Sequence, residues 1–311
     1  MKRSLFIVAV VALLAGTSFA AALGTSANAV IPSDVQQVIS VDYRRMTDSP
    51  TAMALKARVL PDNLKQFETA LKGVGIDPAK DVDQLTFASF RTPTQGVRIV
   101  GIASGQFARP KILKRMQVQK IKGTKYHTSA LYPMNGGMEM TFLDDTTMLF
   151  GEDTAIKFAL GTRDGENASM MSNGRISEMV QDVNGGAVWS VLDGQGTQNM
   201  MRSTLGDAAK LTDYETVKKR LLGSYYTMDF SNGVNFDLNV LTTDSMTATT
   251  LSSLLRAGIM FKKMNATPIE KTAIDATTVE SDNDKLKVHF KSDDQKFQSL
   301  LHSDLFTAVS R

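Results

Sequence analysis

The sequence predicts an α+β protein made of a tandem duplicated unit, with a mostly antiparallel sheet and helices packed on one face of it. Three observations predict this class. Short strands of alternating polarity come in pairs joined by tight turns, which is typical of antiparallel hairpins. Helical periodicity surrounds these hairpins instead of separating single strands, as it would in a doubly wound sheet. The order of elements also begins again near the middle of the 311 residues.

The first 29 residues have the order of a secretory signal peptide. Lys2 and Arg3 give a basic start, residues 5–14 are an unbroken apolar run, and the A-x-A pattern of residues 27–29 follows. We therefore predict cleavage after Ala29, export to the periplasm or the extracellular space, and no transmembrane segment in the mature chain. A retained anchor is the alternative, but residues 16–18 interrupt the apolar run before the roughly 20 residues that a membrane span needs.

Composition narrows the class of protein further. Removing 29 of the 311 residues leaves 282, enough for one large domain or two ordinary ones. The chain has no cysteine, so an exported form has no disulfide and depends on packing for its stability. The removed segment carries two positive charges and no acid, so the net charge falls from +3 to +1. A near-neutral surface argues against nucleic acid as a partner.

The first repeat is predicted to span residues 30–165. After a first strand, Ser49 caps a helix that has Pro50 at its first position, and Gly73 ends the next helix. The turn at residues 92–96 then joins two strands into a hairpin. The predicted strands are residues 35–43, 82–91, 97–103, 125–132, 137–143 and 148–151, and the predicted helices are residues 49–60, 61–73, 107–116 and 154–160.

The second repeat is predicted to span residues 166–311. Its first strand, AVWSVLD, is similar to VISVDY of the first repeat, and Asn232-Gly233 is a hairpin turn signal. The offset between the two halves drifts, so a chance recurrence of the same element order is the alternative. The predicted strands are residues 187–193, 225–230, 234–241, 278–280 and 286–290, and the predicted helices are residues 198–210, 214–222, 247–264 and 294–301.

Several short stretches occur in a familiar order. They are IPSD (31–34), DPAKDVD (77–83), GQF (105–107), GTKY (123–126), TMLFG (147–151) and AVW (187–189). Together they resemble a group of exported bacterial proteins built from two degenerate α+β repeats. The resemblance covers residues 31–193 and implies the architecture and export. It implies no catalytic residue, because the group has no established activity.

The candidates for catalysis and metal binding are weak. The three histidines, His127, His289 and His302, have no ligand spacing, and the first two fall in predicted strands. Without cysteine there is no thiolate site, and no G-x-S-x-G elbow is present. Gly194-Gln195-Gly196 lacks the rest of a phosphate loop and indicates a strand-to-helix turn. The acid pairs 144–145 and 293–294 fit a turn and a helix start. We predict no metal, no cofactor and no catalytic residue.

The stretch MNGGMEM at residues 134–140 raises the question of a soft-metal site. Thioethers suit Cu(I), and the chain has 17 methionines. However, Met138, Met140 and Phe142 share one face of the predicted strand, while Glu139 and Thr141 share the other. We therefore expect these methionines to fill a core, where a flexible thioether packs well.

One charged segment is the tentative binding site. Seven basic residues occur within 17 positions that contain no acid: Arg109, Lys111, Lys114, Arg115, Lys120, Lys122 and Lys125. Such a run can attract anionic lipid headgroups or cell-wall polymers. The alternative is that it lies against the ten acids of residues 126–193, which include only three basic residues. The sequence favours this second interpretation, because a like-charge run is often just a solvated face.

The sequence as a whole predicts an exported, non-catalytic binding or interaction protein of the cell envelope. Its site would be a cleft between the two repeats or the basic segment, and its partner an envelope protein, an anionic lipid or a cell-wall polymer. The alternative is a periplasmic hydrolase with an unrecognised site. A cleft where carboxylates, histidine and serine converge would indicate the hydrolase, whereas an apolar groove with a basic rim would indicate binding.

Overall fold

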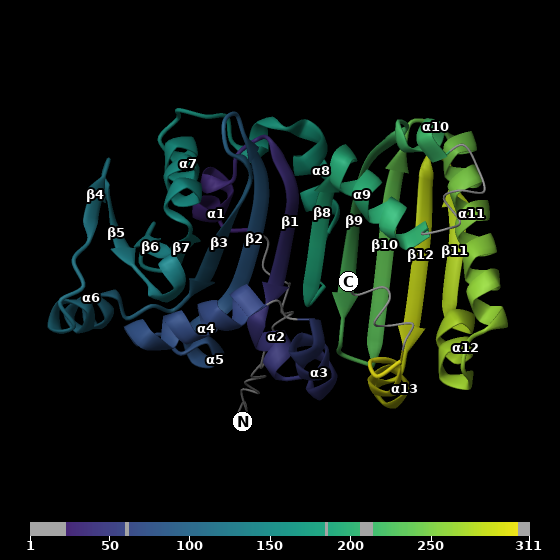
Figure 1. Cartoon of the computed structure of the whole chain (residues 1–311), viewed down its shortest axis with the longest axis horizontal. Coiled ribbons are helices and arrows are strands. Elements are labelled where there is room, and N and C mark those ends of the chain that lie inside the picture. Colours follow the sequence, from purple (N-terminus) through teal and green to yellow (C-terminus); the bar gives the residue numbers. More distant parts are fainter. Residues whose placement is uncertain (1–22, 60–61, 184–185, 206–213, 304–311) are drawn as a thin grey trace, which may run out of the picture.

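One long antiparallel sheet organises the protein (Figure 1). The computed structural model describes residues 23–59, 62–183, 186–205 and 214–303. Among these residues the sheet has twelve strands in the order β11-β12-β10-β9-β8-β1-β2-β3-β7-β6-β5-β4. The strands are β1 Val35–Asp42, β2 Val82–Thr92, β3 Gly96–Gly105, β4 Thr124–Tyr126, β5 Ser129–Pro133, β6 Glu139–Phe142, β7 Thr147–Gly151, β8 Val188–Asp193, β9 Leu221–Asp229, β10 Val234–Thr242, β11 Thr277–Asp282 and β12 Lys285–Ser292.

Helices connect the strands and cover the sheet (Figure 1). The α-helices are α1 Thr25–Val30, α2 Tyr43–Thr47, α3 Pro50–Val59, α4 Asp62–Val74, α5 Pro78–Asp81, α6 Arg109–Val118, α7 Asp153–Arg163, α8 Gly174–Asp182, α9 Gly194–Leu205, α10 Tyr214–Lys218, α11 Ser245–Met264, α12 Pro268–Asp275 and α13 Asp294–Leu300. Short 3-10 turns η1 Asn135–Gly137 and η2 Met170–Ser172 complete the described elements. The predicted α+β class with a mostly antiparallel sheet is confirmed.

The side chains of single strands alternate between two cores in the N-terminal half of the sheet. On β2, Ala88 and Phe90 pack with α1, α7 and α8, whereas Leu85 packs with α4 and α6. Because neighbouring side chains of a strand point to opposite faces, helices cover both faces of the sheet here. In the C-terminal half, Leu286 and Val288 of β12 face α9 and α11, while the next residue, His289, is exposed and bonds to the exposed Asp237 on β10. In this half α9 and α11 cover one face, while on the other face α8 packs against β8 and β9 beside the junction and leaves β12 open.

The two halves have the same strand order outward from their junction. The first half runs β1-β2-β3-β7-β6 and the second runs β8-β9-β10-β12-β11. Within each of these sets of five, the strand that comes last in the chain lies between the third and the fourth. Strands β4 and β5 extend the first half only. The hairpin turns at Gly96 and Gly233, which we expect to correspond, both have positive φ, +71° and +80°. This agreement supports the duplication, which we retain as a proposal because a shared order does not by itself demonstrate a common origin.

The two repeats meet in a hydrogen-bonded strand pair, whereas the sequence suggested a cleft between them. Strand β1 pairs antiparallel with β8, and Ile39 faces Ser190 near the centre of the register. A core beside this junction combines Met46 and Leu55 from the first half with Phe230 from the second. The halves therefore share packing as well as backbone hydrogen bonds.

Several local predictions differ from the structure, and the helix predicted over residues 214–222 ends at Lys218, before β9 begins at Leu221. Residues 125–132 do not form one strand, because the chain reverses at His127, where φ is +48°, and gives the hairpin β4–β5. This turn has no glycine or asparagine to signal it. Helix α8 was not predicted, although Asn173 caps it by accepting a hydrogen bond from Ile176 N at 3.3 Å. The end of the predicted helix 198–210 lies outside the described residues, and α9 is described to Leu205.

Helix α1 lies where the sequence predicts signal-peptide cleavage. Leu23, Ala27 and Val30 are buried in the core beside α7, and Asn28 Nδ2 donates to Leu23 O at 3.1 Å. Cleavage after Ala29 stays a prediction. The burial of Leu23 and Ala27 leads us to propose instead that any processing occurs upstream of Leu23, because removing them would open this core.

Candidate ligand-binding site

Helix α6 carries the basic segment and is held to the sheet by its apolar side. Pro110 fits the first turn, where its missing N–H is not needed. Ile112 and Met116 are buried four positions apart, in the same core as Phe142 of β6. Leu113 is half-buried against the same core, whereas Lys111 and Lys114 are exposed.

The end of α6 folds back and makes a pocket. Lys120 has φ +60°, and Ile121 N donates to Met116 O at 2.9 Å, which is the pattern of a helix that ends in a left-handed residue. Ile121 then packs against the core, while Lys120 and Lys122 stay exposed on either side of it. A hollow of about 450 Å³ lies here, lined by Leu113, Met116, Gln117, Lys120, Ile121, Lys122 and Tyr132. It has an apolar wall and a basic rim.

Tyr132 closes the far side of this pocket because Gly123 lets its ring approach the backbone. A Cβ at Gly123 would lie 2.8 Å from Tyr132 Cε1, which is closer than real contacts allow. Tyr132 lies on β5 and pairs with Met140 of the buried strand β6. The pocket is therefore built between α6, the loop that follows it, and strand β5. Figure 1 shows α6 and β5 at one end of the sheet.

Most of the basic segment has no acidic partner. Arg109 approaches Asp145 with 3.7 Å between Nη1 and Oδ1, and lies 5.6 Å from the ring centre of Phe142. Arg115 lies close to Gly75, where a Cβ would be 3.0 Å from Arg115 Cδ. Within the described ranges, none of the five lysines makes an ion pair, and all are exposed: Lys111, Lys114, Lys120, Lys122 and Lys125. The acids of residues 126–193 thus neutralise only one of the seven cations.

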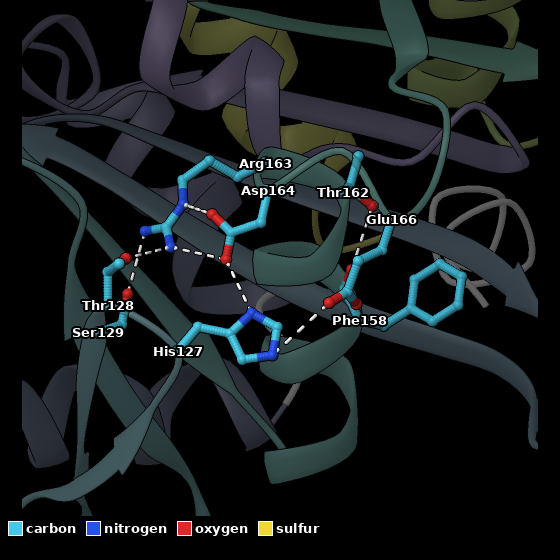
Figure 2. A network of polar contacts seen from close by, with 8 residues as sticks. All are labelled: His127, Thr128, Ser129, Phe158, Thr162, Arg163, Asp164 and Glu166. Carbon is cyan, nitrogen blue, oxygen red and sulfur yellow. Dashed lines mark hydrogen bonds and ion pairs between the residues drawn. The ribbon is translucent and has the colours of Figure 1, made fainter.

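A polar network ties the β4–β5 hairpin to the end of α7 (Figure 2). His127 Nδ1 is 3.1 Å from Asp164 Oδ2, and its Nε2 is 3.5 Å from Glu166 Oε1. Arg163 binds Asp164 through Nε and Nη2, at 2.7 and 3.1 Å, and reaches Ser129 Oγ through Nη1 at 3.0 Å. The network fixes one end of β5, the strand that presents Tyr132 to the pocket.

The electrostatics of this network favour an ionised Asp164. Its two-fold hydrogen bond with Arg163 is the largest cause that lowers the pKa of the carboxyl, and the contact with His127 lowers it further against the opposing effect of burial. The ring of Tyr126 stacks on His127 with centres 4.3 Å apart. Sequence reasoning missed this network, because Asp164 and His127 are 37 positions apart.

The other sequence candidates have structural roles. His289 bonds to Asp237 and His302 to Gln298 O, so the three histidines have separate partners. Asp193 occupies the start of α9 and accepts a hydrogen bond from Gly196 N at 2.7 Å, which confirms the strand-to-helix turn. Over the described part of the chain, no group of three or more His, Asp or Glu is arranged to hold a metal ion.

The methionines of residues 134–140 are packed, as the strand alternation predicts. Met134 and Met140 are buried, and Met138 is half-buried beside them in the core that contains Phe142. Their thioethers therefore fill the space between β6, α4 and α6. The question raised by this stretch is answered in favour of core packing.

A second charged cluster lies on α2, α3 and α4. Tyr43 donates to Glu68 and accepts from Lys56, and the Lys56 ammonium lies 4.4 Å from the centre of the tyrosine ring. Burial, followed by the bond to Glu68, raises the pKa of Tyr43 far above its ordinary value. A phenol that resists ionisation is a poor nucleophile, so the cluster has the properties of a structural clamp.

No family model and no curated protein sequence matches the chain. Among solved structures, crystal forms I and IV of TP0453, from Treponema pallidum, have TM-scores of 0.46 and 0.44 at 9% sequence identity. Each likeness covers 89% of this chain, and 97% or 96% of the other. These values are too low to transfer a function. The described residues also contain no helix that is long and apolar enough to span a membrane.

Proposed function

We propose that the protein is an exported binding protein that takes an anionic amphiphile, an apolar chain with a negative headgroup, into the pocket beside α6. The observation that carries the proposal is the combination of an apolar wall with two unpaired lysines at its rim. The apolar chain would lie against Leu113, Ile121 and Tyr132. The headgroup would lie between the Lys120 and Lys122 ammonium groups.

The dimensions and charges support a small ligand. A hollow of about 450 Å³ falls in the range of about 300–1,000 Å³ that is typical of small-molecule sites. Each lysine near an anionic group contributes about 1 kcal/mol at low salt, so two contribute about tenfold or more in affinity. The wider set of exposed lysines would raise the local concentration of anions around the pocket.

Calorimetric titration with a monomeric lysophosphatidylglycerol tests this proposal. We expect saturable binding, and weaker binding of the zwitterionic lysophosphatidylcholine. The double variant Lys120→Gln, Lys122→Gln should lose about tenfold in affinity, and Gln117→Trp, at an exposed position of the lining, should block the pocket. The matched control Lys157→Gln, Lys287→Gln changes the same charge elsewhere and should bind normally.

Two results would contradict the proposal. A rim variant that still binds the anionic lysolipid as tightly as the wild type does would remove the lysines from recognition. Hydrolysis of the recovered lysolipid by the wild type would instead favour the hydrolase alternative. Mass spectrometry of the ligand after titration distinguishes a bound molecule from a cleaved one.

A further inference from the structure

Helix α11 lies at the opposite end of the sheet from α6 (Figure 1), and it exposes a row of large apolar side chains. Met246, Met260, Phe261 and Met264 are 74, 70, 68 and 76% exposed. At about 100° per residue they fall within roughly 100° of the helix circumference. Ile269, at the start of α12, is also exposed. Large exposed apolar patches of this kind mark interaction surfaces.

The opposite side of α11 packs against the sheet, so the exposed row is not the side of the helix that forms the core. Leu251, Leu254 and Leu255 are buried against β11 and β12. Arg256 donates to Val279 O of β11 and holds the helix along the sheet edge. Asp244 caps the helix by accepting from Thr247 N at 2.8 Å. The helix is anchored on one side and leaves four apolar side chains without a partner in the described structure.

The charge around this row indicates which surface it contacts. Residues 245–269 contain no acid, and Lys262 and Lys263 lie among the exposed apolar residues. Lys263 pairs with Asp275, while Lys262 and Lys271 make no ion pair among the described residues. A second copy of the same surface would bring like charges together. An anionic lipid surface accepts both the apolar row and the lysines.

We propose that the α11–α12 surface rests on an anionic membrane, with Met260, Phe261 and Met264 inserted at the level of the headgroups and Lys271 on the lipid phosphates. The contact is peripheral, because only the outer side of α11 enters the lipid while its inner side stays on the sheet. It is separate from the pocket beside α6 and does not depend on a ligand there. Because apolar insertion is not screened, this contact persists at physiological salt.

Cosedimentation of the full exported chain with vesicles tests this inference. The triple variant Met260→Gln, Phe261→Gln, Met264→Gln should lower partitioning onto phosphatidylglycerol-containing vesicles at least tenfold at physiological salt. All three positions are exposed, so folding should be unaffected and far-ultraviolet circular dichroism can check it. The matched control Met171→Gln replaces another exposed methionine, on η2, and should bind as the wild type does.

A lysine variant separates the electrostatic contribution to membrane binding from the apolar contribution. Lys271→Gln should weaken partitioning onto anionic vesicles severalfold and leave the weaker partitioning onto phosphatidylcholine unchanged. Wild-type partitioning by the triple apolar variant would overturn the proposal. A wild-type dimer that the same variant dissociates, without vesicle binding, would overturn it in favour of self-association.

Discussion

Lys120 occupies a backbone conformation that favours glycine. Its φ of +60° ends α6 and places its ammonium at the pocket rim. A left-handed conformation costs a non-glycine residue about 1 kcal/mol or more. Lys120 therefore lowers the stability of the fold while lying at the proposed site. Substitutions at this position can test both effects.

We predict that Lys120→Gly raises the free energy of unfolding by up to about 1 kcal/mol, while Lys120→Ala does not raise it. Glycine relieves the φ strain, whereas alanine retains it and removes the same charge. Urea denaturation of the two variants measures the difference. Both should bind the lysolipid less tightly than the wild type. Equal stability of the two variants would show that the left-handed end of α6 is not the native conformation.

Asp164 should make stability depend on pH. Its pKa is lowered in the folded protein, chiefly by Arg163, so its stabilising effect is present above the ordinary value of 3.8 and is lost as pH falls through the folded pKa. Asp164→Asn should therefore be less stable than the wild type by about 1 kcal/mol at neutral pH. The gap should close in strong acid.

Thermal unfolding across the acid range measures this effect. Asp145→Asn is the control, because Asp145 is 89% exposed and lies 3.7 Å from its cationic partner, so it should change stability little at any pH. A gap for Asp164→Asn that persists in strong acid would mean that the carboxylate charge is not its source.

At the scale of elements, α1 should be part of the folded domain. A chain that begins at Val30 lacks Leu23 and Ala27, which are 7% and 2% exposed. Loss of one buried leucine typically costs about 2–5 kcal/mol, so this chain should unfold at markedly lower urea concentration than one that begins at Leu23. Sequencing the N-terminus of the exported protein locates the processing site. Equal stability of the two chains, with a native start at Val30, would support the original prediction of cleavage after Ala29.

The exposed cations of α6 should add a salt-sensitive part to membrane attraction. We predict that Lys111→Gln, Lys114→Gln, Arg115→Gln weakens binding to anionic vesicles at low salt, by about 1 kcal/mol for each exposed charge that faces the lipid. The effect should largely vanish at physiological salt, where charges are screened over about 8 Å. Cosedimentation at both salt concentrations measures it.

The control for this variant replaces Lys157, Lys287 and Lys296 by glutamine, because each of them has an acidic partner. An unchanged low-salt affinity of the α6 variant would remove the basic helix from membrane attraction. Salt-resistant binding would remain a property of the α11–α12 surface.

At the scale of the whole molecule, the two proposed repeats should depend on each other. Val38 of β1 and Val191 of β8 are fully buried in one core that also contains Ile176 and Met179 of α8. A fragment of residues 30–165 would expose β1 as an unpaired, apolar edge. We predict that this fragment and residues 166–311 aggregate when expressed alone and associate when expressed together. Size-exclusion chromatography would decide this, and two monomeric, separately folded fragments would contradict it.

Local sequence determined most of the single elements. Pro50 and the Asn232-Gly233 turn predicted where a helix begins and a hairpin turns, because capping and turn chemistry act over a few residues. The helix predicted to end at Gly73 runs to Val74 and is followed by Gly75, which has φ +91°. Strand alternation likewise predicted that Met140 packs in a core. The same reasoning failed at His127, whose turn contains no residue that commonly adopts a positive φ.

The candidate site was predicted in part. The run of seven cations identified the segment that borders the hollow, but composition gave no means of knowing whether the acids that follow would neutralise it. Tertiary structure places most of those acids elsewhere, for example Asp164 on Arg163 and His127, and so leaves Lys120 and Lys122 unpaired. Tyr132 joins them through strand pairing with β6.

By itself, the sequence determined the α+β class, many but not all of its helices and strands, and the basic segment around α6. Only the tertiary structure decided that β1 pairs with β8, that Tyr132 and the rim lysines enclose a pocket, and that α11 keeps its methionines exposed. The physical reason is the distance along the chain over which each interaction acts. Periodicity and turn preferences depend on neighbouring residues, whereas pairing, burial and the neutralisation of charge depend on which distant segments pack together.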